Sequence, residues 1–113
     1  QIKLHITSME RMGASGNEIR LFGGGANSGV WCQIIANITG KRVVVPRTNE
    51  TANLGAAIIA SMGVGGFTDF RRAYSMVGEP QKIFIPGESD VKIYEEAFAK
   101  YRSHNAQILA MDI

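Results

Sequence analysis

The sequence is poor in three features that would narrow its function: cysteine, long apolar runs and charge of one sign. Its single cysteine, Cys32, excludes an internal disulfide and favours a reducing, cytoplasmic setting. Cys32 lies within an apolar helical pattern, which predicts a buried thiol rather than a nucleophile. No stretch has the apolar length of a membrane-spanning helix, so no membrane partner is expected. Twelve basic and ten acidic residues give a net charge of +2 and the basic ones are dispersed, so no nucleic-acid partner is expected.

The length and composition are those of one globular domain. The 113 residues suffice to bury a core, and 45% of them are hydrophobic. The sequence begins with Gln1, in patterned sequence and without a recognisable signal peptide. We interpret residues 1–113 as a single segment of a longer protein.

The central part of the sequence predicts a βαβ unit. Residues 18–22 indicate a short strand that runs into three glycines, and Ser28 is suited to cap the following helix. Helical spacing predicts one buried apolar face, made of Trp31, Ile34, Ile35 and Ile38. Gly40 ends this helix, and the β-branched run 42–46 predicts a strand buried on both faces. Strands joined through a helix are expected to be parallel, with a right-handed crossover.

Two helices are predicted next. Residues 50–62 form the first, and its small residues let another backbone approach closely. These small residues are Gly55, Ala56 and Ala57. Thr68 is expected to cap the second, short helix. Four of its side chains are expected to point inward: Phe70, Ala73, Tyr74 and Val77.

The two ends of the chain carry weaker patterns. Residues 82–86 predict a strand or an extended segment. Ser89 or Asp90 is expected to cap a last helix. Its apolar face comprises Tyr94, Ala97, Phe98 and Tyr101. Residues 1–12 fit a strand and a helix equally well. Ile2, Leu4 and Ile6 alternate as in a strand, whereas Ile2, Ile6 and Met9 fall on one face of a helix.

The glycines at 23–25 lie where a strand is followed by a helix, which is a common ligand position in α/β sheets. The phosphate-loop pattern G-x-x-x-x-G-K-[ST] fails, because Val30 and Trp31 follow Gly29. The dinucleotide pattern G-x-G-x-x-G is met only in part, because Ser28 replaces its third glycine. From these residues alone, a ligand-binding turn and a tight turn without a ligand are equally favoured.

Other chemically capable residues have structural interpretations. His5 and His104 lack ligand-spaced partners, so no metal site is expected. Trp31 is expected to be a core anchor, since it shares a face with other apolar residues. Gln33 is expected to bond to backbone or to be solvated, and Glu50 to order the start of its helix.

A longer string carries a resemblance to a known family. Residues 23–67 resemble the C-terminal domain of the FGGY family of carbohydrate kinases. The matching residues are Gly24, Gly25, Ala26, Ser28, Trp31, Gln33, Ala36, Gly40, Val43, Pro46, Glu50, Gly55, Ala56, Ala57, Gly63 and Gly65. The family's closing segment is matched by Pro86, Tyr94, Phe98 and Tyr101. Asn37 stands where the family usually has Asp.

The resemblance implies an α/β fold: an incomplete ribonuclease-H-like domain of the actin-like ATPase type, with βαβ units and helices packed on a short parallel sheet. It implies the nucleotide-binding side of a two-domain kinase that transfers a phosphoryl group from ATP to a sugar hydroxyl. The form of the turn is closest to pentulose kinases such as xylulokinases. The catalytic Asp, the phosphate hairpins, the Mg²⁺ site and most of the sugar pocket would lie upstream, so no catalytic or metal residue is expected here. Residues 1–12 would be the end of a helix packed on the sheet.

The resemblance also implies the nucleotide contacts. Gly24, Gly25 and Ala26 would lie on the adenosine or α-phosphate side of ATP. Ser28 and Gly29 would lie beside the base. Some family members have Asn at the position of Gly29, so its absence here favours backbone contacts with the base.

Three further expectations concern the function and the self-association of the chain. One alternative function is a non-catalytic nucleotide-binding or interaction module of the actin-like superfamily. A weaker alternative is a small Rossmann-like redox domain. The sheet is expected to have an open edge, which predicts self-association with another copy.

Overall fold

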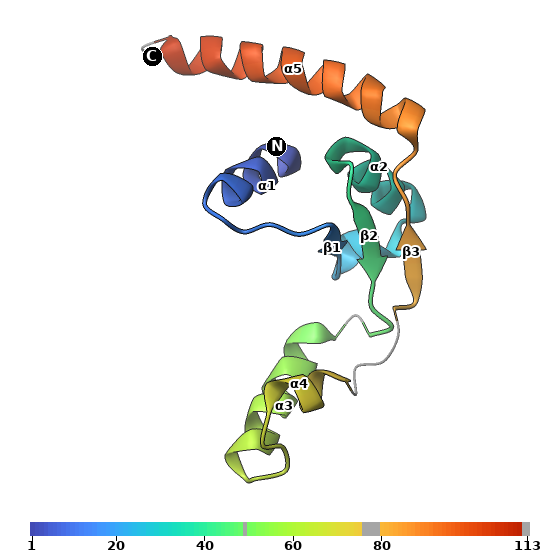
Figure 1. The fold of residues 1–113 in the computed structure, drawn as a ribbon, viewed down its shortest axis with the longest axis vertical. Coiled ribbons are helices and arrows are strands. Elements are labelled where there is room, and N and C mark those ends of the chain that lie inside the picture. The colour runs from blue at the N-terminus through green and yellow to red at the C-terminus, as the bar shows by residue number, and fades with distance from the viewer. Residues whose placement is uncertain (49, 76–79, 112–113) are drawn as a thin grey trace.

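A computed structural model describes residues 1–48, 50–75 and 80–111 (Figure 1). In chain order the elements are α1 (Ile2–Arg11), β1 (Glu18–Arg20), the 3-10 helix η1 (Gly24–Asn27), α2 (Gly29–Thr39), β2 (Arg42–Val45), α3 (Thr51–Gly63), α4 (Phe70–Ser75), β3 (Lys82–Phe84) and α5 (Glu88–Ala110). The predicted helices and strands are therefore present, and the ambiguous first segment is a helix over Ile2–Arg11. The expected burial of Val77 concerns a residue outside the described ones.

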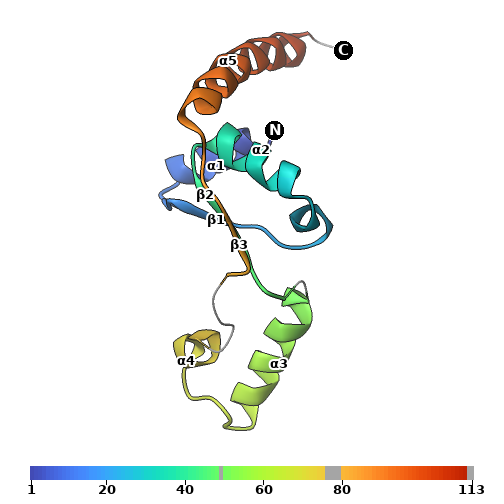
Figure 2. The ribbon, with the colours of Figure 1, turned by 90° about the vertical axis from the view of Figure 1, so that its right-hand side faces the viewer.

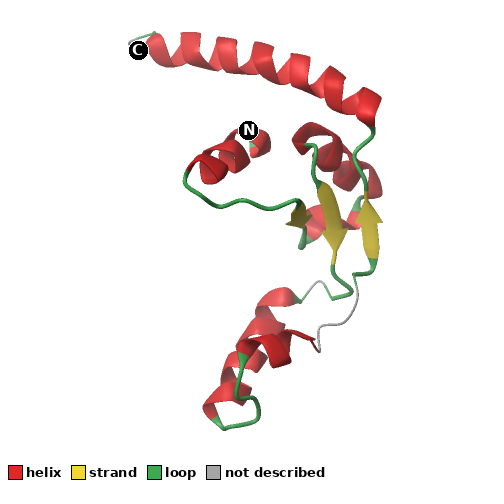
Figure 3. Cartoon of the chain, viewed as in Figure 1, coloured by secondary structure: helices red, strands yellow, loops and turns green. Residues whose placement is uncertain are grey.

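The sheet has three short strands in the order β1-β2-β3 (Figure 3). Strands β1 and β2 are parallel, with Ile19 opposite Val43, which confirms the predicted βαβ pairing. Strand β3 is antiparallel to β2, with Ile83 opposite Val44, so the sheet is mixed rather than wholly parallel. The direction of β3 follows from the position of α3 and α4, which lie beyond the C-terminal end of β2 (Figure 1). The chain therefore re-enters the sheet from that end.

The core lies between α2 and the central strand β2. Its buried members are Ala26, Cys32, Ile35, Ala36, Val43 and Val45, with Ile19, Leu21 and Phe84 packed against them. Val43 and Val44 are fully buried, as predicted for a strand covered on both faces. Cys32 is also fully buried, which confirms the expectation of an inaccessible thiol.

Helix α2 buries a different face from the predicted one. Cys32 and Ala36 are buried beside Ile35, whereas Trp31 is 43% exposed. The small side chains of Cys32 and Ala36 let the helix lie close to the sheet, and the bulkier residues flank that contact. The expectation that Trp31 is a core anchor is therefore wrong.

The two ends of α2 agree with the sequence signals. The Ser28 hydroxyl oxygen accepts a hydrogen bond from the backbone N–H of Trp31 at 3.2 Å. Gly40 has a φ of 68°, in the left-handed region, and its N–H bonds to the carbonyl of Ala36 at 2.9 Å. Both bonds satisfy backbone groups that a helix end leaves open.

The predicted caps of the other helices differ from the observed ones. Helix α5 begins at Glu88 with Gly87 at its N-cap and no side-chain cap, so neither Ser89 nor Asp90 caps it. Before α4, the Asp69 carboxylate accepts the N–H of Arg71 at 3.1 Å, in the role expected of Thr68. A carboxylate is a strong N-terminal acceptor and competes well with a neighbouring hydroxyl.

Helix α4 contains three of the predicted inward residues and buries one of these three. Ala73 is buried, but Phe70 is 61% exposed and Tyr74 is 51% exposed. The Tyr74 ring lies against the guanidinium carbon of Arg20 at 5.2 Å from its centroid. Within the described residues, the six-residue helix α4 has too few neighbours to cover two aromatic rings.

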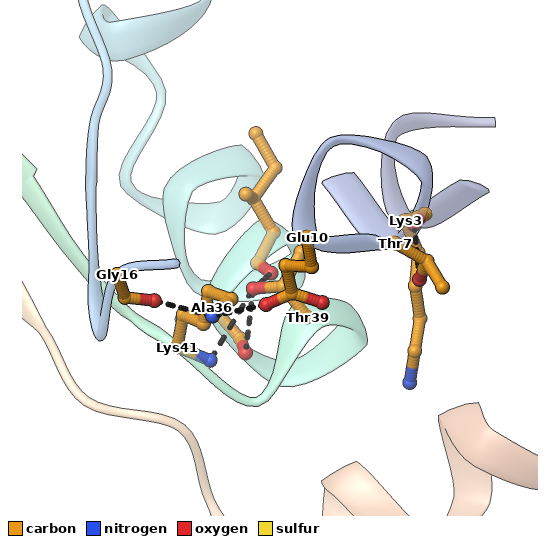
Figure 4. A network of polar contacts seen from close by, with 8 residues as sticks. Lys3, Thr7, Glu10, Gly16, Ala36, Thr39 and Lys41 are labelled. Atoms are coloured by element: carbon orange, nitrogen blue, oxygen red, sulfur yellow. Dashed lines mark hydrogen bonds and ion pairs between the residues drawn. The ribbon is translucent and has the colours of Figure 1, made fainter. Parts of the chain in front are cut away.

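Lys41 ties α1 and the following loop to the turn between α2 and β2 (Figure 4). Its ammonium nitrogen lies 2.6 Å from a carboxylate oxygen of Glu10 and donates to the carbonyl of Gly16. The backbone N–H of Lys41 donates to the Thr39 hydroxyl at 3.3 Å. These contacts place α1 beside α2.

Candidate functional site

The glycine turn connects the end of β1 to the start of α2. Pairing with β2 continues one residue past β1, because the N–H of Leu21 donates to the carbonyl of Val44 at 2.9 Å. Phe22 and Gly23 then lead into η1, and the cap residue Ser28 follows. The predicted site therefore lies at the C-terminal edge of a parallel strand pair and at the positive end of a helix.

The three consecutive glycines have three different surroundings. Gly23 has φ 81° and ψ −167°, a region that only glycine adopts without strain. A Cβ on Gly25 would lie 3.2 Å from the Trp31 ring, so Gly25 lets the indole pack against the turn. A Cβ on Gly24 would meet no atom within 4 Å. Gly24 is thus the glycine that neither its dihedral angles nor internal packing explains.

The remaining predicted site residues differ in how accessible they are. Ala26 is buried in the core, so its methyl group is directed away from solvent. Ser28 and Gly29 are exposed. The Ser28 carbonyl accepts the N–H of Cys32 at 3.0 Å, while Gly29 lies beside the Phe84 ring, 3.7 Å from the place of an added Cβ. Four of the five predicted residues therefore face solvent together, and Ala26 anchors them.

The thiol of Cys32 lies under the turn. Its sulfur is 3.6 Å from the carbonyl oxygen of Ala26 and 4.0 Å from that of Gly25. These weak bonds hold the turn on the first turn of α2. A fully buried sulfur has no access to a substrate, so its role is packing.

Sequence reasoning missed a second polar feature, a clamp between α2 and the junction of β3 with α5. The Gln33 amide donates to the carbonyl of Ile85 at 2.8 Å and to the Asn37 carbonyl oxygen at 2.9 Å. That Asn37 oxygen also accepts the N–H of Gly87 at 3.0 Å. The Asn37 amide donates to a carboxylate oxygen of Asp90 at 2.8 Å.

The clamp confirms the backbone bond expected of Gln33. Asn37 is only 6% exposed, and these bonds satisfy both of its polar atoms. Two amide residues four positions apart in an otherwise apolar helix are a signal for such a clamp, because they lie on the same face.

The described residues offer little acid–base chemistry near the turn. Within them, no three His, Cys, Asp or Glu side chains come together as a metal site. Glu50 precedes α3 and accepts from the Asn53 amide at 3.0 Å, in keeping with a residue that orders a helix start. Glu18 pairs with Arg20 at 3.1 Å and with Arg42 at 2.9 Å. Of the described helices, none is both long enough and apolar enough to cross a membrane.

The glycine turn and the parallel strand pair lie within a region that matches a known protein family. Residues 1–64 match the model of the C-terminal domain of the FGGY family of carbohydrate kinases. Because the match covers more than half of the chain, the chain belongs to this family.

Several individual relatives are kinases named for xylulose. The chain is 30% identical over 101 residues to L-xylulose/3-keto-L-gulonate kinase of Escherichia coli, which covers 87% of this chain and 20% of that protein. It is 36% identical over 98 residues to xylulose kinase of Haemophilus influenzae, and this match covers 85% of this chain and 20% of that protein. The chain therefore spans about a fifth of the length of these relatives.

A solved structure agrees in fold. The ligand-bound xylulose kinase from Lactobacillus acidophilus superposes with a TM-score of 0.79 at 20% identity, covering 87% of this chain and 20% of that one. This likeness confirms the expected α/β fold: the segment folds like the corresponding part of that kinase.

Proposed function

We propose that this chain is the C-terminal part of an ATP-dependent sugar kinase and supplies the wall that faces the adenosine of ATP. The observation that carries the proposal is the exposed backbone of Gly24, which has no neighbour in the direction of an added Cβ. A planar base or a ribose approaches such a backbone more closely than it approaches any other residue type. Membership in a family of carbohydrate kinases supports ATP as the ligand.

In the proposed wall, Gly24, Gly25 and Ala26 lie on the adenosine or α-phosphate side, and Ser28 and Gly29 lie beside the base. Ala26 contributes backbone only, because its methyl group is part of the core. Gly29 has no side chain with which to read a base, so base contacts there are backbone contacts. The positive end of α2 favours the negative charge of the nucleotide.

The chemistry proposed for the whole protein is transfer of the γ-phosphoryl group of ATP to a sugar hydroxyl, whose proton passes to a carboxylate base. Such a transfer needs Mg²⁺, phosphate-binding groups and a positioned hydroxyl. The chain matches only the C-terminal domain of the carbohydrate-kinase family, and we propose that Mg²⁺ and the base are held outside residues 1–113. The relatives are named for xylulose, which supports a pentulose such as xylulose as the substrate.

The test is a phosphorylation assay on the full-length parent protein with a panel of ketoses and polyols. We expect ATP-dependent phosphorylation of a pentulose by the parent and none by the 113-residue chain alone. In the parent, Gly24→Val should raise the KM for ATP, because the new side chain occupies the open side of the turn. Gly16→Val, at another exposed glycine, is the matched control. Sugar phosphorylation by the chain alone, or an unchanged KM in Gly24→Val, contradicts the proposal.

We further propose a cytoplasmic location, where ATP is available and a single thiol stays reduced. Self-association through the outer edge of β1 is also proposed, since β1 is an edge strand with one neighbour. That edge is only three residues long and carries Glu18 and Arg20, so the association should be weak. Sedimentation of the 113-residue chain tests it: a strictly monomeric species at high concentration rules it out.

A further inference from the structure

Helix α3 carries no charged side chain and buries none of its residues. Residues 51–68 contain no Asp, Glu, Lys, Arg or His. No residue of α3 is buried, and Ile59 is 65% exposed. A helix that is largely apolar on all sides is stable in water only when other structure covers it. Helix α3 therefore needs a cover that the described residues do not provide.

Helices α3 and α4 enclose an apolar groove, the α3–α4 groove. It has a volume of about 430 Å³ and is lined by Gly55, Ile58, Ile59, Phe70, Arg71 and Tyr74. Of these lining residues, only Arg71 carries a charge. A Cβ on Gly55 would meet no atom within 4 Å, so a second backbone has room to approach there.

The groove lies at one end of the described structure, where Tyr74 contacts Arg20 of β1. Figures 1 and 2 show α3 and α4 beyond the ends of the strands, on the side away from α5. The radius of gyration is 17.9 Å. A compact domain of this length has a value of about 13 Å. The excess reflects elements that project without neighbours, and α3 with α4 is the more apolar of them.

We propose that the α3–α4 groove docks an apolar segment from the part of the kinase that lies outside residues 1–113. This inference rests on the proposed function. The relatives are about five times longer than the matched region, so most of such a protein is available to supply the segment. A segment of the same polypeptide has a high effective concentration and occupies the groove ahead of a second copy.

The groove also restricts the chemistry of the segment. Because α3 has no charge, a charged residue placed against it would be buried without a partner. The contacting side chains are therefore aliphatic or aromatic. The small residues Gly55, Ala56 and Ala57 suit the close approach of a helix. Acidic groups of the segment are accommodated at the rim, near Arg71 and near Arg20, whose guanidinium carbon lies 5.2 Å from the Tyr74 ring centroid.

Cysteine accessibility in the full-length parent protein tests this docking directly. Cys32 is fully buried, and any accessible cysteine of the parent outside residues 1–113 is first replaced by serine, so a single introduced cysteine reports its own position in native protein. Ile59→Cys and Tyr74→Cys report the groove, and Ser103→Cys on the exposed polar face of α5 is the matched control. In the native parent, both groove cysteines should react with a maleimide at least about tenfold more slowly than Ser103→Cys. In the 113-residue chain all three should react at similar rates.

The other outcomes overturn either the docking or the proposed function. Groove cysteines that react as fast as Ser103→Cys in the native parent show that no segment covers the groove. Protection that appears in the 113-residue chain and grows with its concentration identifies a second copy as the occupant. Sugar phosphorylation by the same parent is measured separately. An active parent with an unprotected groove refutes the docking alone, and an inactive parent with a protected groove refutes the function alone.

Discussion

Replacement of Asn37 by aspartate tests the clamp that joins α2 to the start of α5. The change swaps the side-chain N–H₂ group for an oxygen and leaves the shape almost unchanged. The other oxygen still accepts from Gln33 and Gly87. In the wild type, the Asn37 side-chain N–H₂ group donates to a carboxylate oxygen of Asp90 at 2.8 Å. In the variant, a carboxylate oxygen takes the place of this donor. Asn37→Asp therefore removes one charge-assisted bond and places two like charges in contact.

The size of the effect follows from the lost bond and from exposure. A hydrogen bond to a charged group contributes about 1.5–3 kcal/mol. Asp90 is exposed, so it can turn into water, and the repulsion adds little beyond the lost bond. We expect Asn37→Asp to lower the free energy of unfolding by about 2 kcal/mol at pH 8, a large part of the stability of a small domain.

The pH dependence of the variant has a defined sign. The carboxyl group introduced at position 37 is nearly buried, since Asn37 is only 6% exposed, and burial disfavours its charged form, so its pKa should lie above that of an ordinary aspartate. The folded variant then binds more protons than the unfolded one, and its stability falls as the pH rises. The deficit relative to wild type should therefore be largest at pH 8 and shrink toward pH 5.

Urea unfolding at several pH values, followed by the fluorescence of Trp31, measures these differences. The double variant Asn37→Asp with Asp90→Asn is the control, because it restores one donor opposite one carboxylate. It should recover at least half of the lost stability at pH 8. The reasoning is refuted if Asn37→Asp is as stable as wild type at pH 8, or if its deficit grows on acidification.

Three glycines provide further predictions. Gly25→Ala places a Cβ 3.2 Å from the Trp31 ring. It should lower the free energy of unfolding, measured in urea, by about 1 kcal/mol and shift the wavelength of the Trp31 fluorescence emission. An unchanged emission argues against the packing of Trp31 on Gly25. Gly24→Ala meets no atom within 4 Å. It should change stability by less than about 0.5 kcal/mol while weakening ATP binding by the parent, measured by calorimetry. Gly40→Ala forces alanine to a φ of 68°. This substitution should lower the free energy of unfolding by about 1 kcal/mol. A variant that unfolds at the same temperature as the wild type contradicts this expectation.

Features governed by neighbouring residues were predictable from the sequence. Ser28 caps α2 and Gly40 ends it because both roles depend on the local backbone. The β-branched run at 42–45 forms the buried central strand for the same reason. The orientation of α2 was not predictable in this way. Apolar residues occur on most of its sides, so their spacing does not decide that Cys32 faces the sheet while Trp31 faces solvent.

The candidate site was predictable in position but not in detail. The place of the glycine turn between strand and helix follows from the order of the elements. Gly23 is required by its backbone dihedral angles, and Gly25 is required by its contact with Trp31. Neither the angles nor the contact can be derived from the amino-acid sequence. The hydrogen bond between Asn37 and Asp90 joins residues 53 positions apart, so no local sequence pattern predicts it.

The buried cluster around β2 has a consequence for folding kinetics. All of its members except Phe84 lie between residues 19 and 45. Contacts within so short a stretch close small loops, which form quickly and lose little chain entropy. We expect the strand–turn–helix–strand unit to form first, and β3 and α5 to add to it later. Slower amide hydrogen exchange in β3 than in β2 would contradict this order. A chain still emerging from the ribosome could then shape the glycine turn before the residues of α5 are synthesised.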